Sequence, residues 1–150
     1  QINRPIQPHI ESVESKDLLD SITSLMTLDS EIDLTVKDEF NSTLQIDRAL
    51  MTQVLINLIK NAQDAVKEVE APEILIHITS SQSDKVCMSV EDNGQGVPDH
   101  AIKEIFVPFY TTKAEGSGIG LALSRNIVRA HGGSLVYSRE SGWTRFTVRL

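Results

Sequence analysis

Three polar residues follow one another at helical spacing in the middle of the sequence. Asn57, Asn61 and Asp64 stand at positions i, i+4 and i+7, so a helix would carry them on one narrow face. That face borders an apolar stripe, which would place the polar row at the mouth of a pocket. An asparagine carbonyl is a hard oxygen ligand that suits Mg²⁺, whose other ligands are often phosphate oxygens and water. Taken alone, the row is more often a set of solvated or capping side chains.

A second candidate is the run Asp92-Asn93-Gly94-Gln95-Gly96, which directly follows a strand-like segment. A carboxylate at a strand end can accept a hydrogen bond from an exocyclic amine, and the two glycines leave room for a flat ring and permit positive φ. A plain turn would use the same residue types. A calcium loop is disfavoured, because the alternating acidic ligands and the distal glutamate of such loops are missing.

A third candidate is the glycine-rich run Gly116-Ser117-Gly118-Ile119-Gly120-Leu121, which leads into an apolar helix. Bare backbone N–H groups at a helix N-terminus bind phosphate, and the helix dipole favours the anion. The run matches neither common nucleotide loop, because it follows a loop rather than a strand and contains no Gly-Lys-Ser/Thr. A flexible linker is the alternative, and the apolar helix behind the glycines makes it the poorer interpretation.

Aromatic residues lie between these runs, in the segment from Phe106 to Lys113. Aromatic side chains in a loop are costly to expose, so they indicate packing or closure over a ligand. Lys113 could reach a terminal phosphate as a point charge, although a lone lysine is usually a surface residue. Each of the four signals is modest alone, and their order and spacing together indicate a nucleotide site.

The hydrophobic pattern predicts the elements that position these residues. Asp47 is the expected N-cap of the longest helix, and Pro72 its stop. Helices are expected over 16–27, 47–69, 99–106 and from 118 or 120 to 131. Strands are expected over 32–36, 43–46, 73–79, 85–91, 134–138 and 144–150. Antiparallel-looking strand pairs with helices between them predict an α+β fold, a two-layer sandwich with three main helices on one face of a mixed, mostly antiparallel sheet.

Length and composition fit one domain with a single core. The chain has 150 residues, of which 1–15 contain Pro5 and Pro8 and little periodicity, so we expect an arm followed by a domain over 16–150. The formal net charge of −7 argues against nucleic-acid binding. One cysteine, Cys87, excludes a disulfide within the chain and suits the cytoplasm. No apolar stretch is long enough to span a membrane.

The order of these motifs resembles the GHKL superfamily of ATP-binding domains, most closely its histidine-kinase branch. Residues 57–62 resemble the N box, 92–96 the G1 box, 106–109 the F box and 116–120 the G2 box. Thr111-Thr112-Lys113 and His131-Gly132-Gly133 also fit the family pattern. The resemblance extends over roughly 16–150, nearly the whole chain, and four ordered boxes make it specific.

The resemblance implies a Bergerat-type sandwich that binds ATP and Mg²⁺ beneath a lid. It implies that Asp92 binds the adenine amino group, that Asn61 ligates Mg²⁺, and that Asn57 and Lys113 assist at the phosphates. Asp64 stands where many relatives carry a basic residue, and the lid over 111–116 is shorter than in many kinases. The other implied nucleotide contacts are Asp64, Ala65, Gly94, Gly96, Val97, Phe109, Thr112, Gly116, Ser117, Gly118, Ile119, Gly120 and Leu121.

The superfamily includes ATPases that carry a glutamate, the general base, one helical turn before the Mg²⁺ asparagine. Asn57 occupies that position here and cannot take a proton at working pH, so hydrolysis is disfavoured and transfer to a histidine is implied. His9 lacks the acidic neighbour and downstream proline of the family's phosphoacceptor box, and a structural or incidental role is expected for it and for His77, His100 and His131.

We therefore expect the acceptor in an upstream dimerisation domain, a response regulator receiver domain as partner, and any membrane attachment outside this chain. A serine kinase that regulates a sigma factor and a non-catalytic nucleotide sensor are the alternatives.

Overall fold

A five-stranded sheet forms one layer of the structure, a computed structural model that describes residues 5–108 and 120–150. Its strands lie in the order β2 (Asp33–Asp38), β4 (Glu73–Ser80), β5 (Val86–Asp92), β7 (Trp143–Arg149) and β6 (Ser134–Glu140). Only β2 and β4 run parallel, and every other neighbouring pair is antiparallel. The prediction of a mixed, mostly antiparallel sheet is confirmed, as is the hairpin of β4 and β5.

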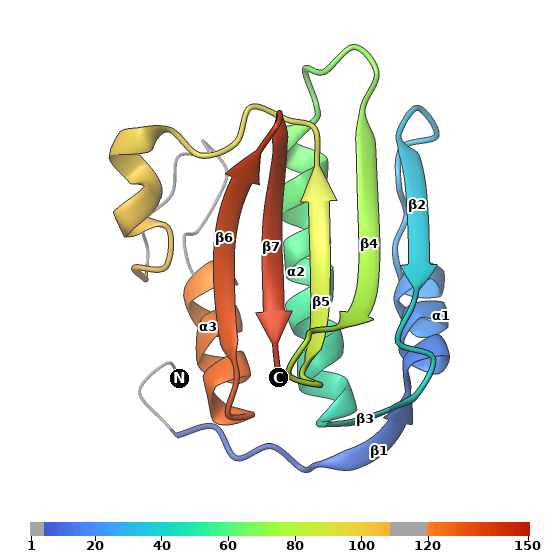
Figure 1. Cartoon of the computed structure of the whole chain (residues 1–150). Coiled ribbons are helices and arrows are strands. Elements are labelled where there is room, and N and C mark those ends of the chain that lie inside the picture. Colours follow the sequence, from blue (N-terminus) through green and yellow to red (C-terminus); the bar gives the residue numbers. More distant parts are fainter. Residues whose placement is uncertain (1–4, 109–119) are drawn as a thin grey trace.

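Three α-helices cover one face of this sheet and form the second layer (Figure 1). They are α1 (Ser15–Leu25), α2 (Arg48–Ala65) and α3 (Gly120–Ala130). A 3₁₀ helix, η1 (Asp99–Glu104), lies beyond the β6 edge. The predicted α+β two-layer sandwich is therefore confirmed. Within residues 5–108 and 120–150, no helix is long and apolar enough to cross a membrane.

The core lies between α2 and the covered face of the sheet. The apolar stripe of α2 packs against alternate residues of β4 and β5, and each of these side chains is at most 3% exposed. Truncating one of the large aliphatic side chains to alanine would cost about 2–5 kcal/mol. The stripe comprises Met51, Val54, Leu55, Leu58, Ile59 and Ala62, and the strands contribute Ile74, Ile76, Ile78, Met88 and Val90.

Residues 11–14, which the sequence placed in an irregular arm, form a strand instead. This strand, β1 (Glu11–Glu14), pairs antiparallel with β3 (Thr43–Ile46) in a separate two-stranded sheet. Val13 is 2% exposed and joins the main core. A run of four residues with one apolar side chain is too short to show a strand period. The strand is stabilised by its pairing with β3, about thirty residues away in the sequence.

The predicted helix limits need small corrections. The 16–27 helix runs from Ser15 to Leu25, and the helix expected to reach residue 69 ends at Ala65. Beyond Ala65 the chain tightens into turns, in which Lys67 N–H donates to the Asp64 carbonyl. The described part of the last helix begins at Gly120, and Gly118, the other glycine proposed to open it, lies outside the described residues.

The N-terminus of α2 is fixed by Asp47, as predicted. Its side chain accepts hydrogen bonds from the Leu50 N–H (3.0 Å) and the His9 N–H (2.9 Å). The Asp47 N–H donates to His131 Nε2 (3.0 Å), and His131 Nδ1 lies 2.8 Å from the Ile127 carbonyl, to which it donates. The Asp47 carboxylate thus connects the start of α2 with the segment around His9, and the backbone N–H of Asp47 connects the start of α2 with the end of α3.

We predict that Asp47→Ala lowers the free energy of unfolding at pH 7 by about 1–2 kcal/mol, because an N-cap is lost. The bond from Leu50 N–H, then that from His9 N–H, lowers the pKa of Asp47 below its usual 3.8. The ionised cap therefore stabilises the fold above that value, and the stabilisation is lost as the pH falls through the lowered pKa.

Asp47→Asn is the matched control, because its amide oxygen can still cap Leu50 but its NH₂ group faces the His9 donor. Urea unfolding should rank it between the wild type and the alanine variant at pH 7, with a smaller gap to the wild type at acid pH. Equal stability of all three proteins at pH 7 would contradict this role.

Candidate functional site

The polar row predicted on the longest helix lies on α2 beside its buried stripe. Asn57 and Asn61 are half-buried, and Asp64 is exposed near the end of the helix, where it pairs with Lys67 (3.3 Å). Because the three residues are spaced about one turn apart in a regular helix, they share one face. The stripe fixes the rotation of α2 and therefore the direction of this row.

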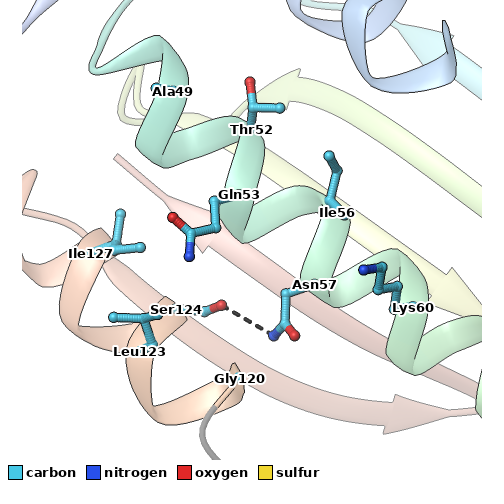
Figure 2. A pocket seen from close by; sticks show the side chains of 10 residues that line it. All are labelled: Ala49, Thr52, Gln53, Ile56, Asn57, Lys60, Gly120, Leu123, Ser124 and Ile127. Atoms are coloured by element: carbon cyan, nitrogen blue, oxygen red, sulfur yellow. Dashed lines mark hydrogen bonds between the residues drawn. The ribbon is translucent and has the colours of Figure 1, made fainter. Parts of the chain in front are cut away.

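Asn57 connects α2 to the first turn of α3. Its Nδ2 donates to Ser124 Oγ at 3.2 Å, and Ser124 is 2% exposed (Figure 2). Its Oδ1 lies against Gly120, where a Cβ atom would overlap the amide. Gly120 is the first residue of α3, so the amide oxygen of Asn57 is held beside the N–H groups of a helix N-terminus.

A cavity of about 430 Å³ lies between α2 and α3 and begins at this contact. Asn57, Lys60 and Gly120 line one end of it in Figure 2, and Ala49 lies at the other. Lys60 is exposed, so it adds a positive charge to the end at which α3 begins. The cation and the helix N-terminus suit an anionic ligand, and the amide oxygen suits a metal cation that accompanies it. The remaining lining residues are Thr52, Gln53, Ile56, Leu123, Ser124 and Ile127.

Asp92 is a buried carboxyl group at the end of β5. It is 3% exposed, and its Oδ1 accepts from the Gly94 N–H at 2.9 Å. Burial raises the pKa of Asp92 from its usual 3.8 to about 6, against the opposite effects of the Gly94 N–H and of the positive charge of Arg139. A ligand that donates a hydrogen bond to this carboxylate would favour its ionised form.

The loop after Asp92 packs directly on the end of α2. A Cβ atom on Gly94 would overlap the carbonyl oxygen of Ala65, so only glycine allows this approach. Gly96 adopts a φ of 76°, in the region that favours glycine. Val97 follows half-buried, and its N–H donates to the Tyr137 hydroxyl at 3.3 Å. Asp92, Gly94 and Ala65, all predicted site residues, are therefore brought together.

The structure thus places most of the predicted residues that it describes in two groups, one at the end and one near the middle of α2. Asp92, Gly94 and Ala65 lie at the C-terminal end of the helix, and Asn57 and Gly120, followed by Leu121, lie two turns earlier. Asn61 stands one turn from each group. The predicted residues Phe109, Thr112, Lys113, Gly116, Ser117, Gly118 and Ile119 lie outside the described residues, and their roles stay predictions.

Four residues that contact the site were not identified from the sequence. Ser124 bonds to Asn57, and Arg139, Thr144 and Tyr137 surround the loop after Asp92. Ser124 could have been found as the one polar residue a helical turn after Gly120. The other three lie on β6 and β7, where nothing in the local pattern distinguishes them.

The buried carboxyl group of Asp92 leads to a stability prediction. Its folded-state pKa is raised from 3.8 to about 6, so the folded state is penalised as the pH rises through this window. Asp92→Asn keeps an oxygen for the Gly94 N–H and removes the charge. At pH 8 we expect the ligand-free variant to be about 1–3 kcal/mol more stable than the wild type, by the cost of about 1.4 kcal/mol per pKa unit.

Urea unfolding of both proteins from pH 3.5 to 8 tests this. The difference should vanish toward pH 3.5, where the wild-type carboxyl group is mostly neutral in both states, and should level off above pH 6. A constant difference across the range would show that charge burial is not its cause.

Comparisons with known proteins agree with this geometry. Residues 46–150 match the sequence profile of the family described as histidine kinase-, DNA gyrase B-, and HSP90-like ATPase. Sensor histidine kinase ZraS of Escherichia coli O157:H7 is 35% identical over all of this chain, which spans 33% of that relative.

Two solved structures also match the fold. The nucleotide-free catalytic domain of histidine kinase ThkA superposes with a TM-score of 0.82 at 28% identity, covering 95% of each chain. ThkA in complex with the response regulator TrrA matches with a TM-score of 0.76 at 27% identity, covering 94% of this chain and 41% of that one. The chain therefore belongs to the family of histidine kinase-, DNA gyrase B- and HSP90-like ATPases, in which it corresponds to the catalytic ATP-binding domain of sensor histidine kinases.

Proposed function

We propose that this chain binds ATP with Mg²⁺ and positions the γ-phosphoryl group for transfer to a histidine on a separate dimerisation domain. The observation that carries this proposal is the separation of the two groups along α2. Asn57 and Ala65 are eight residues apart, or about 12 Å along a helix axis, on the order of the length of a nucleoside triphosphate. The proposed base-binding carboxylate, Asp92, thus lies beside the C-terminal end of α2, and the proposed phosphate-side residue, Asn57, lies near the middle of the same helix.

The Asp92 end suits an adenine ring. The exocyclic amine of adenine would donate to the buried carboxylate, whereas guanine carries a carbonyl oxygen there and would oppose two acceptors. Gly94 removes the side chain where the loop meets α2, and Gly96 and Val97 continue the loop. Ala65 and Asp64 end α2 beside it, so both are proposed as neighbours of the nucleotide.

The Asn57 end suits the phosphates. Gly120 and Leu121 are the first residues of α3 within the part of the chain that the structure describes, and backbone N–H groups at a helix N-terminus bind anions. The amide oxygens of Asn57 and Asn61 are hard donors that fit Mg²⁺, with Asn61 as the proposed ligand. Bound Mg²⁺ would neutralise phosphate charge. We assign the remaining phosphate contacts to Gly116, Ser117, Gly118 and Ile119, and those of the lid to Phe109, Thr112 and Lys113, as the resemblance implies.

A kinase is favoured over a hydrolase by the residue at position 57. An asparagine amide cannot accept a proton from water at neutral pH, so the nucleophile must bring its own base, as an imidazole does. The described contacts of His131 and His77 are structural: His131 bonds to Asp47 and Ile127, and His77 contacts Glu39. The acceptor histidine is therefore proposed to lie outside this chain.

The partners and setting follow from this assignment. We propose that residues 16–150 are the ATP-binding domain and that 1–15 connect it to phosphoacceptor helices, with β1 as the junction that packs on the domain. A response regulator is the proposed downstream partner, as the ThkA–TrrA complex suggests. The net charge of −7 makes nucleic acid a poor partner. The domain would act in the cytoplasm, with any membrane attachment outside this chain.

Calorimetry with a non-hydrolysable ATP analogue tests nucleotide binding. With Mg²⁺ we expect a dissociation constant in the micromolar range, equivalent to about −8 kcal/mol. Asp92→Asn should abolish binding, because the amide presents a donor to the adenine amine. Asn61→Ala should weaken binding in Mg²⁺ and remove the difference between buffers with and without the cation.

Asp33→Asn is the matched control, because Asp33 is an exposed carboxylate on the opposite sheet edge, in β2, and its variant should bind like the wild type. A folded wild-type chain that does not bind adenine nucleotides would overturn the proposal.

The class of acceptor is tested by mixing the chain and ATP with histidine-bearing dimerisation helices. Phosphohistidine is lost in acid and kept in base, whereas phosphoserine behaves in the opposite way and would indicate a serine kinase.

A further inference from the structure

The edge strand β6 holds the loop after Asp92 from outside the nucleotide site. Arg139 Nη1 donates to the Gly94 carbonyl at 3.0 Å and to Thr144 Oγ1 at 2.6 Å. Two residues earlier on the same strand, the Tyr137 hydroxyl accepts from the Val97 N–H at 3.3 Å. Residues i and i+2 of a strand share a face, so both side chains reach the loop from one side.

The loop lies directly against the Arg139 side chain. A Cβ atom on Gly96 would come within 2.7 Å of Arg139 Nη1 and 2.9 Å of Thr144 Oγ1. Thr144, which is 3% exposed, stands opposite Arg139 in the β6–β7 pair and fixes the guanidinium. Tyr137 is fixed by its ring, which packs on Phe146 with centroids 5.3 Å apart. Each of these two side chains on β6 therefore has a second contact besides the loop: Arg139, which is exposed, with Thr144, and Tyr137 with Phe146.

The peptide units around Gly94 connect Arg139 to Asp92. The N–H of Gly94 donates to Asp92 Oδ1, while its carbonyl accepts from Arg139. On its other side Gly94 abuts Ala65 of α2. The loop is thus clamped between α2 and β6, and the clamp sets the direction of the Gly94 N–H that orients the carboxylate.

We propose that Arg139, supported by Tyr137, is a positioning residue for adenine recognition, which it serves by holding the Gly94–Val97 loop and thereby the Asp92 carboxylate. This inference rests on the proposed function. Arg139 acts through the loop, to which its Nη1 group is bonded at the Gly94 carbonyl while it also donates to Thr144.

A purely structural role for Arg139 would change stability alone, so the test needs a readout at Asp92. The positive charge of Arg139 lowers the pKa of Asp92 against the raising effect of burial. Adenine binding should therefore weaken as the pH falls through about 6, and the midpoint should move upward when this charge is removed. Asp64 and Lys67, the charged residues around the end of α2, pair with each other, and Glu91 pairs with Arg145 on the opposite face of the sheet.

The experiment titrates the whole chain with Mg·ADP, which lacks the γ-phosphate, from pH 5 to 8. Arg139→Met keeps much of the aliphatic stem and removes the charge and the hydrogen bonds. We expect its affinity at pH 8 to fall roughly tenfold, the size of one lost charge-assisted hydrogen bond, and its pH midpoint to rise. Arg139→Lys retains the charge without the planar fork, so it should keep the wild-type midpoint and recover part of the affinity.

Arg149→Met is the matched control, because Arg149 is an exposed arginine on the neighbouring strand β7, and its variant should bind like the wild type. Wild-type affinity and midpoint in a folded Arg139→Met protein would overturn the inference, as would an affinity loss without any shift of the midpoint.

If Arg139→Met does not fold, the Tyr137→Phe variant is the test. It removes the hydroxyl that accepts from the Val97 N–H and should weaken ADP binding about threefold at an unchanged midpoint. Absence of ADP binding by the wild type would instead contradict the proposed function itself.

Discussion

The burial of one stripe of α2 against the sheet is the constraint on which the site depends. Each residue turns a helix by 100°, so the stripe from Met51 to Ala62 leaves a single rotation in which all its side chains are buried. That rotation directs Asn57 toward Ser124 and Gly120 and brings Ala65 against Gly94. A shift of the helix by one residue would expose core side chains and would also turn the polar row away from α3. The free energy gained by burying the apolar stripe therefore fixes both the hydrophobic core and the direction of the polar row on α2.

Asp92 shows the opposite relation between stability and function. Because the Asp92 carboxyl group is only 3% exposed, burial disfavours its ionised form, and its pKa of about 6 reflects that cost. The Gly94 N–H and the charge of Arg139 offset part of the cost but not all of it. A ligand that donates to the carboxylate would supply the missing stabilisation. The ligand-free domain thus retains an unfavourable group, which the binding of such a ligand would compensate.

The sequence predicted well those features that depend on local periodicity or on one residue type. The start of α2 at Asp47, the hairpin of β4 and β5, and the positive φ in the glycine-containing loop after Asp92 all follow from such signals. Features that depend on distant partners were missed. Arg139 resembles any exposed strand arginine until the fold brings Gly94 beside it, and β1 becomes a strand only when β3 supplies its hydrogen bonds. The prediction that α2 extends to residue 69 was wrong for a local reason. Val66 and Val69 continue the apolar spacing, although the helix ends at Ala65 and turns follow.

Helices α2 and α3 are connected to each other at two separated points. Asn57 lies against Gly120, the first residue of α3, and bonds to Ser124, one turn later. Just after the last residue of α3, His131 accepts from the N–H of Asp47. Between these points, side chains of the two helices line the cavity of about 430 Å³ that lies between them. Two polar contacts at the ends can hold this spacing, whereas continuous apolar packing would close it. Because Asp47 also bonds to His9, the segment that precedes β1 is joined to the helix that carries the polar row. A displacement of that segment would therefore act first on the start of α2, three helical turns before Asn57.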